Sequence, residues 1–344
     1  MIKYPSIEQF RNVIRTVKTQ HDYKGKDEQG EPIYKHDSPY PTLTFRGTVK
    51  LHGTNAAIVF YKNGDIQFQS RENVLSMQND NAGFWMTMNK PEIIEVLKEH
   101  LVGGAYFEEY IAFYGEWCGG NIQKGVAING LPKMFVIFGC KVDSKWTEID
   151  NPGDTDASRW EDVKILNNHN IYYVSQFQTW SVDVDFNYPE QYQNKFIEIT
   201  EQVEKECPAG MFFGNSGVGE GVVWKCIERP ELMFKVKGEK HSVSKVTKLA
   251  AVDTVMVESM KQFAEDTVTE ARLQQGIDKL KELNKPLDEK STGDFLRWIV
   301  GDILKEEQDT IVKSQLDIKK LGGVLSNKAR VWWFNHINSQ VYEN

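Results

Sequence analysis

The lysine of the run KLHGTN, Lys50–Asn55, has the clearest potential for covalent chemistry in this chain. Lys50 follows a strand-like stretch and precedes a Gly-Thr pair, a common setting for a lysine that attacks the α-phosphate of a nucleotide. An ordinary lysine is neutral in only about 1 molecule in 2,500 at pH 7, so such a nucleophile needs surroundings that remove its proton. Lys-x-x-Gly alone is a frequent pattern, and the prediction therefore depends on further residues.

Three later clusters supply the other residue types that this chemistry needs. YGEWCGGNIQKG places Glu116 just after the apolar run Tyr106–Tyr114, and GEGVVWK places Glu220 at the head of a β-rich run. ELMFKVK places Lys235 and Lys237 two residues apart on a strand, so both side chains project from one face.

The paired lysines are expected to have two roles. If Lys235 and Lys237 converge on the phosphate that Lys50 attacks, like charges lower the pKa of Lys50. A depression of ~2 units would make the neutral amine about a hundredfold more abundant. The same two lysines would neutralise charge that develops on the α-phosphate.

An aromatic residue and two carboxylates would complete a nucleotide site. Phe138, in the buried-strand pattern KMFVIFGCKV, offers a flat apolar surface for stacking of adenine. Glu220 is the candidate for organising a hydrated Mg²⁺ ion, with Glu116 as a second candidate, because Mg²⁺ keeps most of its waters and takes few direct protein ligands.

Taken in order, these motifs resemble those of the covalent nucleotidyltransferases, and most closely those of the bacteriophage RNA ligase 2 family, which is related to the RNA-editing ligases. KLHGTN matches that family's Lys-x-His-Gly-Thr-Asn motif without a gap. GEWCGGNIQKGV, VIFG, GEGVVWK and FKVK are similar to its later motifs, and KYPSIE is similar to its opening. The resemblance extends from residue 1 to about residue 245.

The resemblance implies an ATP-dependent RNA ligase that joins a 3′-hydroxyl to a 5′-phosphate through a lysyl-AMP, with Mg²⁺ or Mn²⁺ as cofactor. It also implies that Glu116 contacts the ribose of the nucleotide and that Arg71 faces the ribose or phosphate side. The implied catalytic residues are Lys50, Glu220, Lys235 and Lys237. The implied nucleotide-binding residues are these four with Leu51, His52, Asn55, Arg71, Glu116 and Phe138.

Two other functions stay open on the sequence. A GTP-using, capping-type guanylyltransferase would use the same first step, although capping enzymes and DNA ligases usually carry a β-barrel after their first domain. A catalytically silent nucleotide or RNA sensor is disfavoured because every reactive position is retained.

The order of expected elements predicts an α+β fold, since strands and helices do not alternate regularly. The resemblance implies a nucleotidyltransferase domain of ATP-grasp-like antiparallel sheets over residues 1–243. Strands are expected at Thr42–Lys50, Ala56–Lys62, Asp65–Arg71, Tyr106–Tyr114, Met134–Val142, Ile171–Ser175, Gly221–Ile227 and Glu231–Lys237, and helices at Pro91–Val102 and Pro189–Glu206.

From about Ser244 onward the pattern has a helical period, which predicts a smaller all-helical domain over residues 244–344. Ser291-x-x-Asp294 resembles a capping box at a helix start. The pair Gly322-Gly323 is expected to precede a separate last helix, whose Trp332 and Trp333 are predicted to lie in the core.

An N-terminal helix is predicted from apolar residues at helical spacing, with Arg11, Arg15 and Lys18 on the other side. Polar insertions at Gln20–Tyr40 and Asp143–Trp160 touch no motif but are places where RNA contacts could differ.

The net charge of −8 argues against a protein that coats nucleic acid through overall basicity, so any RNA contact must be local. The basic run Lys235–Lys248 is the best local candidate. Four cysteines without a C-x-x-C pair signal neither a zinc site nor disulfides. No apolar run approaches the ~18 residues that a membrane span needs, so none is expected. We expect the protein to act in the cytoplasm of a cell or of an infected bacterium. We also expect it to be a monomer.

Overall fold

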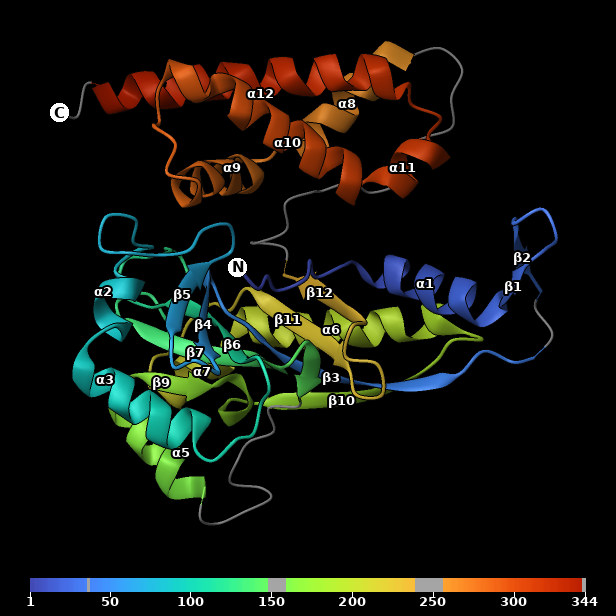
Figure 1. Ribbon diagram of the computed structural model, residues 1–344. Helices are drawn as coiled ribbons and strands as arrows, with labels where there is room; N and C mark the ends of the chain where they lie inside the picture. Colours follow the sequence, from blue (N-terminus) through green and yellow to red (C-terminus); the bar gives the residue numbers. More distant parts are fainter. Residues whose placement is uncertain (36–37, 148–158, 239–255, 342–344) are drawn as a thin grey trace. The chain divides into compact units, whose positions relative to one another are not determined.

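A computed structural model describes residues 1–35, 38–147, 159–238 and 256–341 of the chain (Figure 1). The chain forms two compact units, Met1–Lys240 and His241–Asn344. The predicted boundary at residues 243–244 lies outside the described residues, as do Lys240, Lys245 and Lys248 of the basic run. The predicted domains, a nucleotidyltransferase domain over residues 1–243 and a helical domain over residues 244–344, therefore stay predictions in their exact bounds and in their functions.

The first unit begins with one helix and a short hairpin and then builds two larger sheets. Its strands are β1 (Tyr23–Lys26), β2 (Pro32–Tyr34), β3 (Thr42–Lys50), β4 (Gly53–Tyr61), β5 (Ile66–Ser70), β6 (Tyr110–Cys118), β7 (Met134–Val142), β8 (Lys145–Thr147), β9 (Ile171–Tyr173), β10 (Thr179–Asp185), β11 (Gly221–Cys226) and β12 (Met233–Lys237). Its helices are α1 (Phe10–Asp22), α2 (Phe84–Met88), α3 (Pro91–Val96), η1 (Leu97–Val102), α5 (Arg159–Asn168), η2 (Val174–Gln176), η3 (Pro189–Tyr192), α6 (Gln193–Lys205) and α7 (Pro208–Phe212).

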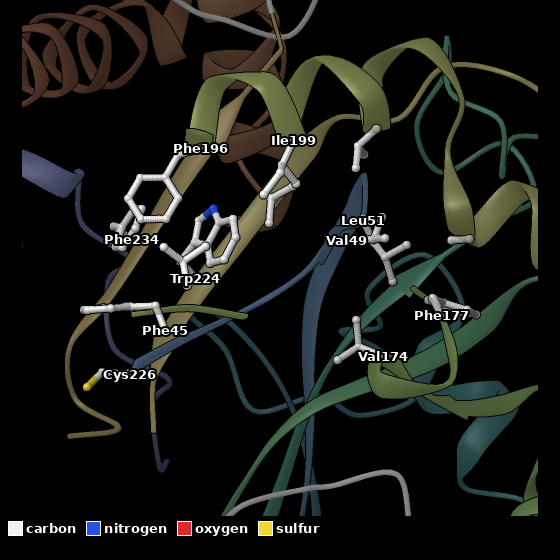
Figure 2. Packing of buried hydrophobic residues seen from close by; sticks show 14 of the residues in the cluster. Phe45, Val49, Leu51, Val174, Phe177, Phe196, Ile199, Trp224, Cys226 and Phe234 are labelled. Atoms are coloured by element: carbon white, nitrogen blue, oxygen red, sulfur yellow. The ribbon is translucent and has the colours of Figure 1, made fainter. Parts of the chain in front are cut away.

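A four-stranded antiparallel sheet, in the order β10-β3-β11-β12, carries the nucleophile strand at its centre. Along β3, buried and half-buried residues alternate, as expected for a strand with only one face in the core. Phe45 and Val49 point into that core, where Trp224 of β11 packs against Phe196 of α6 with ring centroids 4.7 Å apart (Figure 2). Helix α6 therefore covers this face, and Lys50 belongs to the other face.

The second sheet has the order β5-β4-β6-β7-β8, and β9 pairs with β7 in parallel. Strand β6 runs four residues further than predicted, to Cys118, and its pairing with β4 places Glu116 opposite Asn55. Glu116 thus lies within a central strand rather than after one. Strand β10 had no counterpart among the predicted strands.

The described part of the second unit, residues 256–341, contains helices and no strand. Its elements are α8 (Met256–Thr267), α9 (Glu270–Glu282), η5 (Glu289–Ser291), α10 (Thr292–Glu306), α11 (Gln308–Lys313) and α12 (Ile318–Val341). Two local predictions are wrong: the Ser291 side chain makes no capping hydrogen bond, and α12 continues through Gly322-Gly323.

Packing explains why α12 does not break at the glycine pair. Leu321 and Leu325, which flank the pair, are both fully buried in the helical core. Trp333 is also fully buried, with its ring centroid 4.5 Å from that of Phe295, so the core prediction holds for this residue. Burial of these side chains outweighs the ~1 kcal/mol that each helical glycine costs.

Antiparallel sheets with flanking helices, followed by a helical unit, confirm the predicted α+β class. Among the described helices, none combines the length and the apolar character that crossing a membrane requires.

Candidate active site

Three adjacent strands bring the nucleophile candidate together with two of its predicted partners. The register pairs Lys50 on β3 with Gly221 on β11, and Gly221 with Lys237 on β12. Gly221 has φ +152°, and a Cβ there would lie 2.2 Å from the Val236 oxygen. The glycine thus allows the close approach of β12, and Glu220 directly precedes it.

The Glu220 carboxylate lies between the cationic side chains. Lys50 Nζ donates to Glu220 Oε2 at 2.7 Å, Lys237 Nζ lies 3.3 Å from Oε1, and His52 Nδ1 lies 3.2 Å from Oε2. The Glu220 side chain is 2% exposed, whereas those of Lys50, His52 and Lys237 are 21%, 23% and 15% exposed. A buried acid is therefore surrounded by bases that a ligand can reach.

This carboxylate raises the pKa of the nucleophile. Burial acts to lower the pKa of Lys50, but the charge of Glu220, then that of Glu116, and the hydrogen bond to Glu220 raise it above its ordinary value. The predicted lowering of this pKa concerns Lys235 and Lys237 gathered on a bound phosphate and stays a prediction. Burial raises the pKa of Glu220, but Lys50, Lys237 and His52 outweigh it and hold that pKa well below its ordinary value.

Glu116 lies beside the start of β4. Its Oε1 accepts a hydrogen bond from the Gly53 amide at 3.0 Å, and Asn55 is its partner across the strands. A Cβ at Gly53 would lie 2.4 Å from the Trp117 oxygen, so this close pairing needs glycine. Burial, opposed chiefly by Lys50, raises the pKa of Glu116 to about 7.

The second predicted phosphate contact, Lys235, lies two register pairs further along β12 from Glu220 than Lys237 does. It is opposite Val223, which in turn pairs with Thr48, so these three half-buried side chains share the face of Lys50. The Lys235 amide donates to the Glu8 oxygen at 3.0 Å. Sequence reasoning missed Val223 and Thr48 as lining residues, although the alternation of β3 and β11 contained that signal.

Two predicted nucleotide contacts, Leu51 and Phe138, have side chains that pack against other parts of the protein. The Leu51 side chain is 6% exposed and belongs to the core beside Val49 and Val174 (Figure 2), so only its main chain is available to a nucleotide. Phe138 lies at a bulge in the pairing of β6 with β7, where one strand carries an extra residue. A bulge re-aims a side chain, and the Phe138 ring meets that of Tyr4 edge-on at 5.0 Å.

Arg71 is anchored by a residue of the N-terminal segment. Its Nη2 donates to Ser6 Oγ at 3.4 Å, and Arg71 lies one residue past the pair of Ser70 with Ala56. It is therefore close to the Asn55 end of β4 but held by the N-terminal segment.

The N-terminal segment was missed as a structural part of the site. Tyr4 is 8% exposed and donates to Met233 Sδ of β12 at 3.1 Å, and the Glu8 amide donates to the Met233 oxygen. On the other sheet, the Ile2 amide donates to Gln69 Oε1 at 3.1 Å. This segment thus joins both sheets, and the only signal for it in the sequence was KYPSIE.

The acidic residues present fit a hydrated divalent cation better than a closed protein cage. Among the described residues, no group of three or more His, Cys, Asp or Glu side chains could hold a metal. The charge of Glu220 helps to raise the pKa of Glu116, so the two carboxylates are near neighbours. Two carboxylates together with substrate phosphates are a usual environment for Mg²⁺.

A search of curated proteins gave no match. Solved structures with a similar fold include three of the Naegleria gruberi RNA ligase: one mutant with AMP and Mn (TM-score 0.43, 17% identity), the ligase with PPi (0.42, 18%) and another mutant with ATP and Mn (0.41, 17%). Each match covers 70% of this chain but only 57% of that ligase. The family model described as RNA ligase matches residues 43–247, more than half of the 344 residues, and the chain therefore belongs to the RNA ligase family.

Proposed function

We propose that this protein is an ATP-dependent RNA ligase of the RNA ligase 2 type, which joins RNA ends through a lysyl-AMP on Lys50. The observation that carries the proposal is the alignment of Lys50, Gly221 and Lys237 across three strands, with Glu220 between the two lysines. Family membership supports it further, because the matched residues include the whole of this arrangement.

In the first step the neutral amine of Lys50 attacks the α-phosphorus of ATP, the bond from that phosphorus to the bridging oxygen breaks, and pyrophosphate leaves. The ion pair with Glu220 favours the protonated amine, so Lys50 must lose this partner before it reacts. Phosphate oxygens compete for Lys237, and a hydrated Mg²⁺ bound beside Glu220 and Glu116 would neutralise the phosphates. Lys235 and Lys237 then stabilise the charge on the α-phosphate.

The next two steps transfer the AMP and join the RNA. An oxygen of the RNA 5′-phosphate attacks the AMP phosphorus, and the phosphorus–nitrogen bond to Lys50 breaks. The 3′-hydroxyl then attacks the activated 5′-phosphate, a phosphodiester forms, and AMP leaves. Selection for RNA would depend on a 2′-hydroxyl near the 3′ end and on A-form shape, because no base-reading motif is visible.

Labelling distinguishes the proposal from its alternatives. Incubation with α-labelled ATP or GTP should label the protein from ATP only, whereas a capping-type guanylyltransferase would be labelled from GTP and a silent sensor from neither. Protein labelled by ATP should then seal a nicked RNA duplex. Labelling without sealing of any RNA end would contradict the ligase proposal but retain the nucleotidyl transfer.

A further inference from the structure

Residues 2–8, which we call the N-terminal strap, are fixed to both large sheets of the first unit. At the start of the strap, the Ile2 amide donates to Gln69 Oε1 on β5 at 3.1 Å. At its end, the Glu8 amide donates to the Met233 oxygen on β12 at 3.1 Å. Because β5 and β12 are edge strands, the strap crosses from the edge of one sheet to the edge of the other before α1 begins (Figure 1).

Three residues that are predicted to bind the nucleotide contact this strap directly, and each belongs to a different part of the chain. Arg71, which follows β5, donates to a strap hydroxyl at 3.4 Å. The Lys235 amide on β12 donates to a strap carbonyl at 3.0 Å. The ring of Phe138 on β7 meets the ring of Tyr4 at 71°, with centroids 5.0 Å apart. Tyr4 is thus the strap residue that reaches the predicted base-stacking position.

The Tyr4 side chain is held by both sheets. Of the strap residues it is the most buried, at 8% exposure. Its ring packs against Tyr114 on β6 at 5.2 Å and against Trp146 on β8 at 5.3 Å. Its hydroxyl donates to Met233 Sδ on β12, which belongs to the other sheet, at 3.1 Å. These contacts leave the Tyr4 ring little freedom to move.

Phe138 needs such a fixed neighbour because it is the extra residue of the bulge between β6 and β7. A regular ladder sets the direction of a side chain, whereas a bulge re-aims it. Phe138 is half-buried, so part of its ring remains accessible to a ligand. A Cβ on the next residue, Gly139, would lie 3.0 Å from Tyr4 Cε2. The Tyr4 ring therefore packs directly on the bulge and limits the orientations of Phe138.

We propose that Tyr4 is a positioning residue, which holds the Phe138 ring in the orientation that stacks on the adenine of ATP. The inference rests on the proposed function, in which Phe138 contacts the base. Tyr4 acts through Phe138, and stacking depends on the relative tilt and offset of the two rings. A Phe138 ring without this support should lose affinity for the base, while the phosphate contacts of the site persist.

Two ligands separate recognition of the base from recognition of the phosphates. α,β-Methylene-ATP carries adenine but cannot transfer AMP to Lys50, and inorganic tripolyphosphate has no base. Titration calorimetry of the full chain with Mg²⁺ gives the Kd of each ligand. Tyr4→Ala should weaken binding of the methylene analogue about tenfold, as loss of one base stack does, and that of tripolyphosphate by less than about twofold. Tyr4→Phe keeps the ring and should bind both ligands like the unmodified protein.

A double-mutant cycle tests whether Tyr4 acts through Phe138. Phe138→Ala should weaken binding of the methylene analogue by about tenfold or more. Adding Tyr4→Ala to this variant should weaken binding no further, because the ring that Tyr4 positions is already absent. Independent contributions of the two residues would instead add.

Phe60 provides a matched control for the loss of a buried aromatic ring. It is 5% exposed and packs in the core on the other face of the sheet, with Phe68 and Phe84. Phe60→Ala should lower the melting temperature at least as much as Tyr4→Ala does. It should leave the ratio of the two Kd values unchanged, because general loosening of the sheet does not act on the base alone.

Three results would overturn the proposal: an unchanged ratio of the two Kd values in Tyr4→Ala, the same change of ratio in Phe60→Ala, or additive losses in the cycle. If Tyr4→Ala does not fold, Tyr4→Leu fills much of the space without a ring and gives the same comparison. Binding is read without transfer of AMP. An unmodified protein that binds the methylene analogue but forms no lysyl-AMP from ATP would therefore refute the proposed function and not this inference.

Discussion

The two units each bury a charged cluster, but with opposite sign at the centre. In the first unit a buried acid, Glu220, is surrounded by half-buried bases. In the helical unit the centre is Arg272, which is 0% exposed and lies 3.1 Å from Asp302 Oδ2 and 3.3 Å from Glu306 Oε2. One cluster leaves its cations accessible to an anionic ligand, and the other encloses its cation completely.

The enclosed cluster fits a structural role. Arg272 Nη1 also donates to the Thr267 oxygen at 3.1 Å, and Glu307 lies 3.8 Å from Nη2, so one guanidinium ties α8, α9 and the end of α10 together. Removing the partners of a buried charge strongly destabilises the folded state. The accessible cluster, in contrast, can exchange an internal carboxylate for phosphates, which is what nucleotidyl transfer requires.

The largest expected effect is therefore on stability, in the enclosed cluster. Arg272→Ala should lower the free energy that opens α9 and α10 by about 3–5 kcal/mol, since it removes the buried cation from three largely buried carboxylates. Hydrogen exchange of the amides in these helices measures that opening locally. The control Arg297→Ala, whose side chain is 79% exposed in a pair with Asp294, should change it by less than about 1 kcal/mol. Equal effects of the two variants would show that the buried Arg272 contributes no more to stability than the exposed Arg297.

The next effect is on activity, in the accessible cluster. Lys237→Ala and Lys235→Ala should each slow transfer of AMP to the protein by about 10²–10³-fold, as loss of one stabilising donor does. Both side chains are half-buried on a strand face rather than in the core. The melting temperature of each variant should therefore stay within a few degrees of that of the unmodified protein. Rapid labelling from ATP in both variants would refute their role, and Lys195→Ala serves as the control of equal charge.

A smaller effect concerns pH. The pKa of Glu116 is about 7 in the folded protein and near 4.5 when unfolded, so the folded state binds more protons between these values and stability falls as pH rises through this window. The variant Glu116→Gln should lack this loss. Relative to the unmodified protein it should gain on the order of 3 kcal/mol between pH 4.5 and 8. Chemical denaturation at several pH values measures the difference, and parallel pH profiles would show that Glu116 does not titrate there.

Local pattern was enough to predict the strands of the accessible cluster. Alternation placed Lys235 and Lys237 on one face, and the structure puts that face beside Lys50. Alternation could not predict that Glu220, 170 residues from Lys50 in the sequence, would enter the cluster as a direct ion-pair partner and raise the pKa of the nucleophile. That sign depends on a contact between distant parts of the chain.

The predicted boundaries of elements were wrong where tertiary packing opposed the local preference of the sequence. The Gly322-Gly323 pair reads as a break, yet Leu321 and Leu325 anchor both sides of it in one helical core. The N-terminal bridge of Tyr4 to both sheets had no periodic signal at all, because its residues are used as single contacts rather than as one face of an element.

Direct identification of the modified lysine tests the central claim. Protein first stripped of bound AMP would be incubated with ATP and Mg²⁺, digested and examined by mass spectrometry. The account predicts a single AMP on the peptide that contains Lys50, and no such modification in Lys50→Ala. AMP on another lysine, or no AMP on the stripped protein, would contradict it.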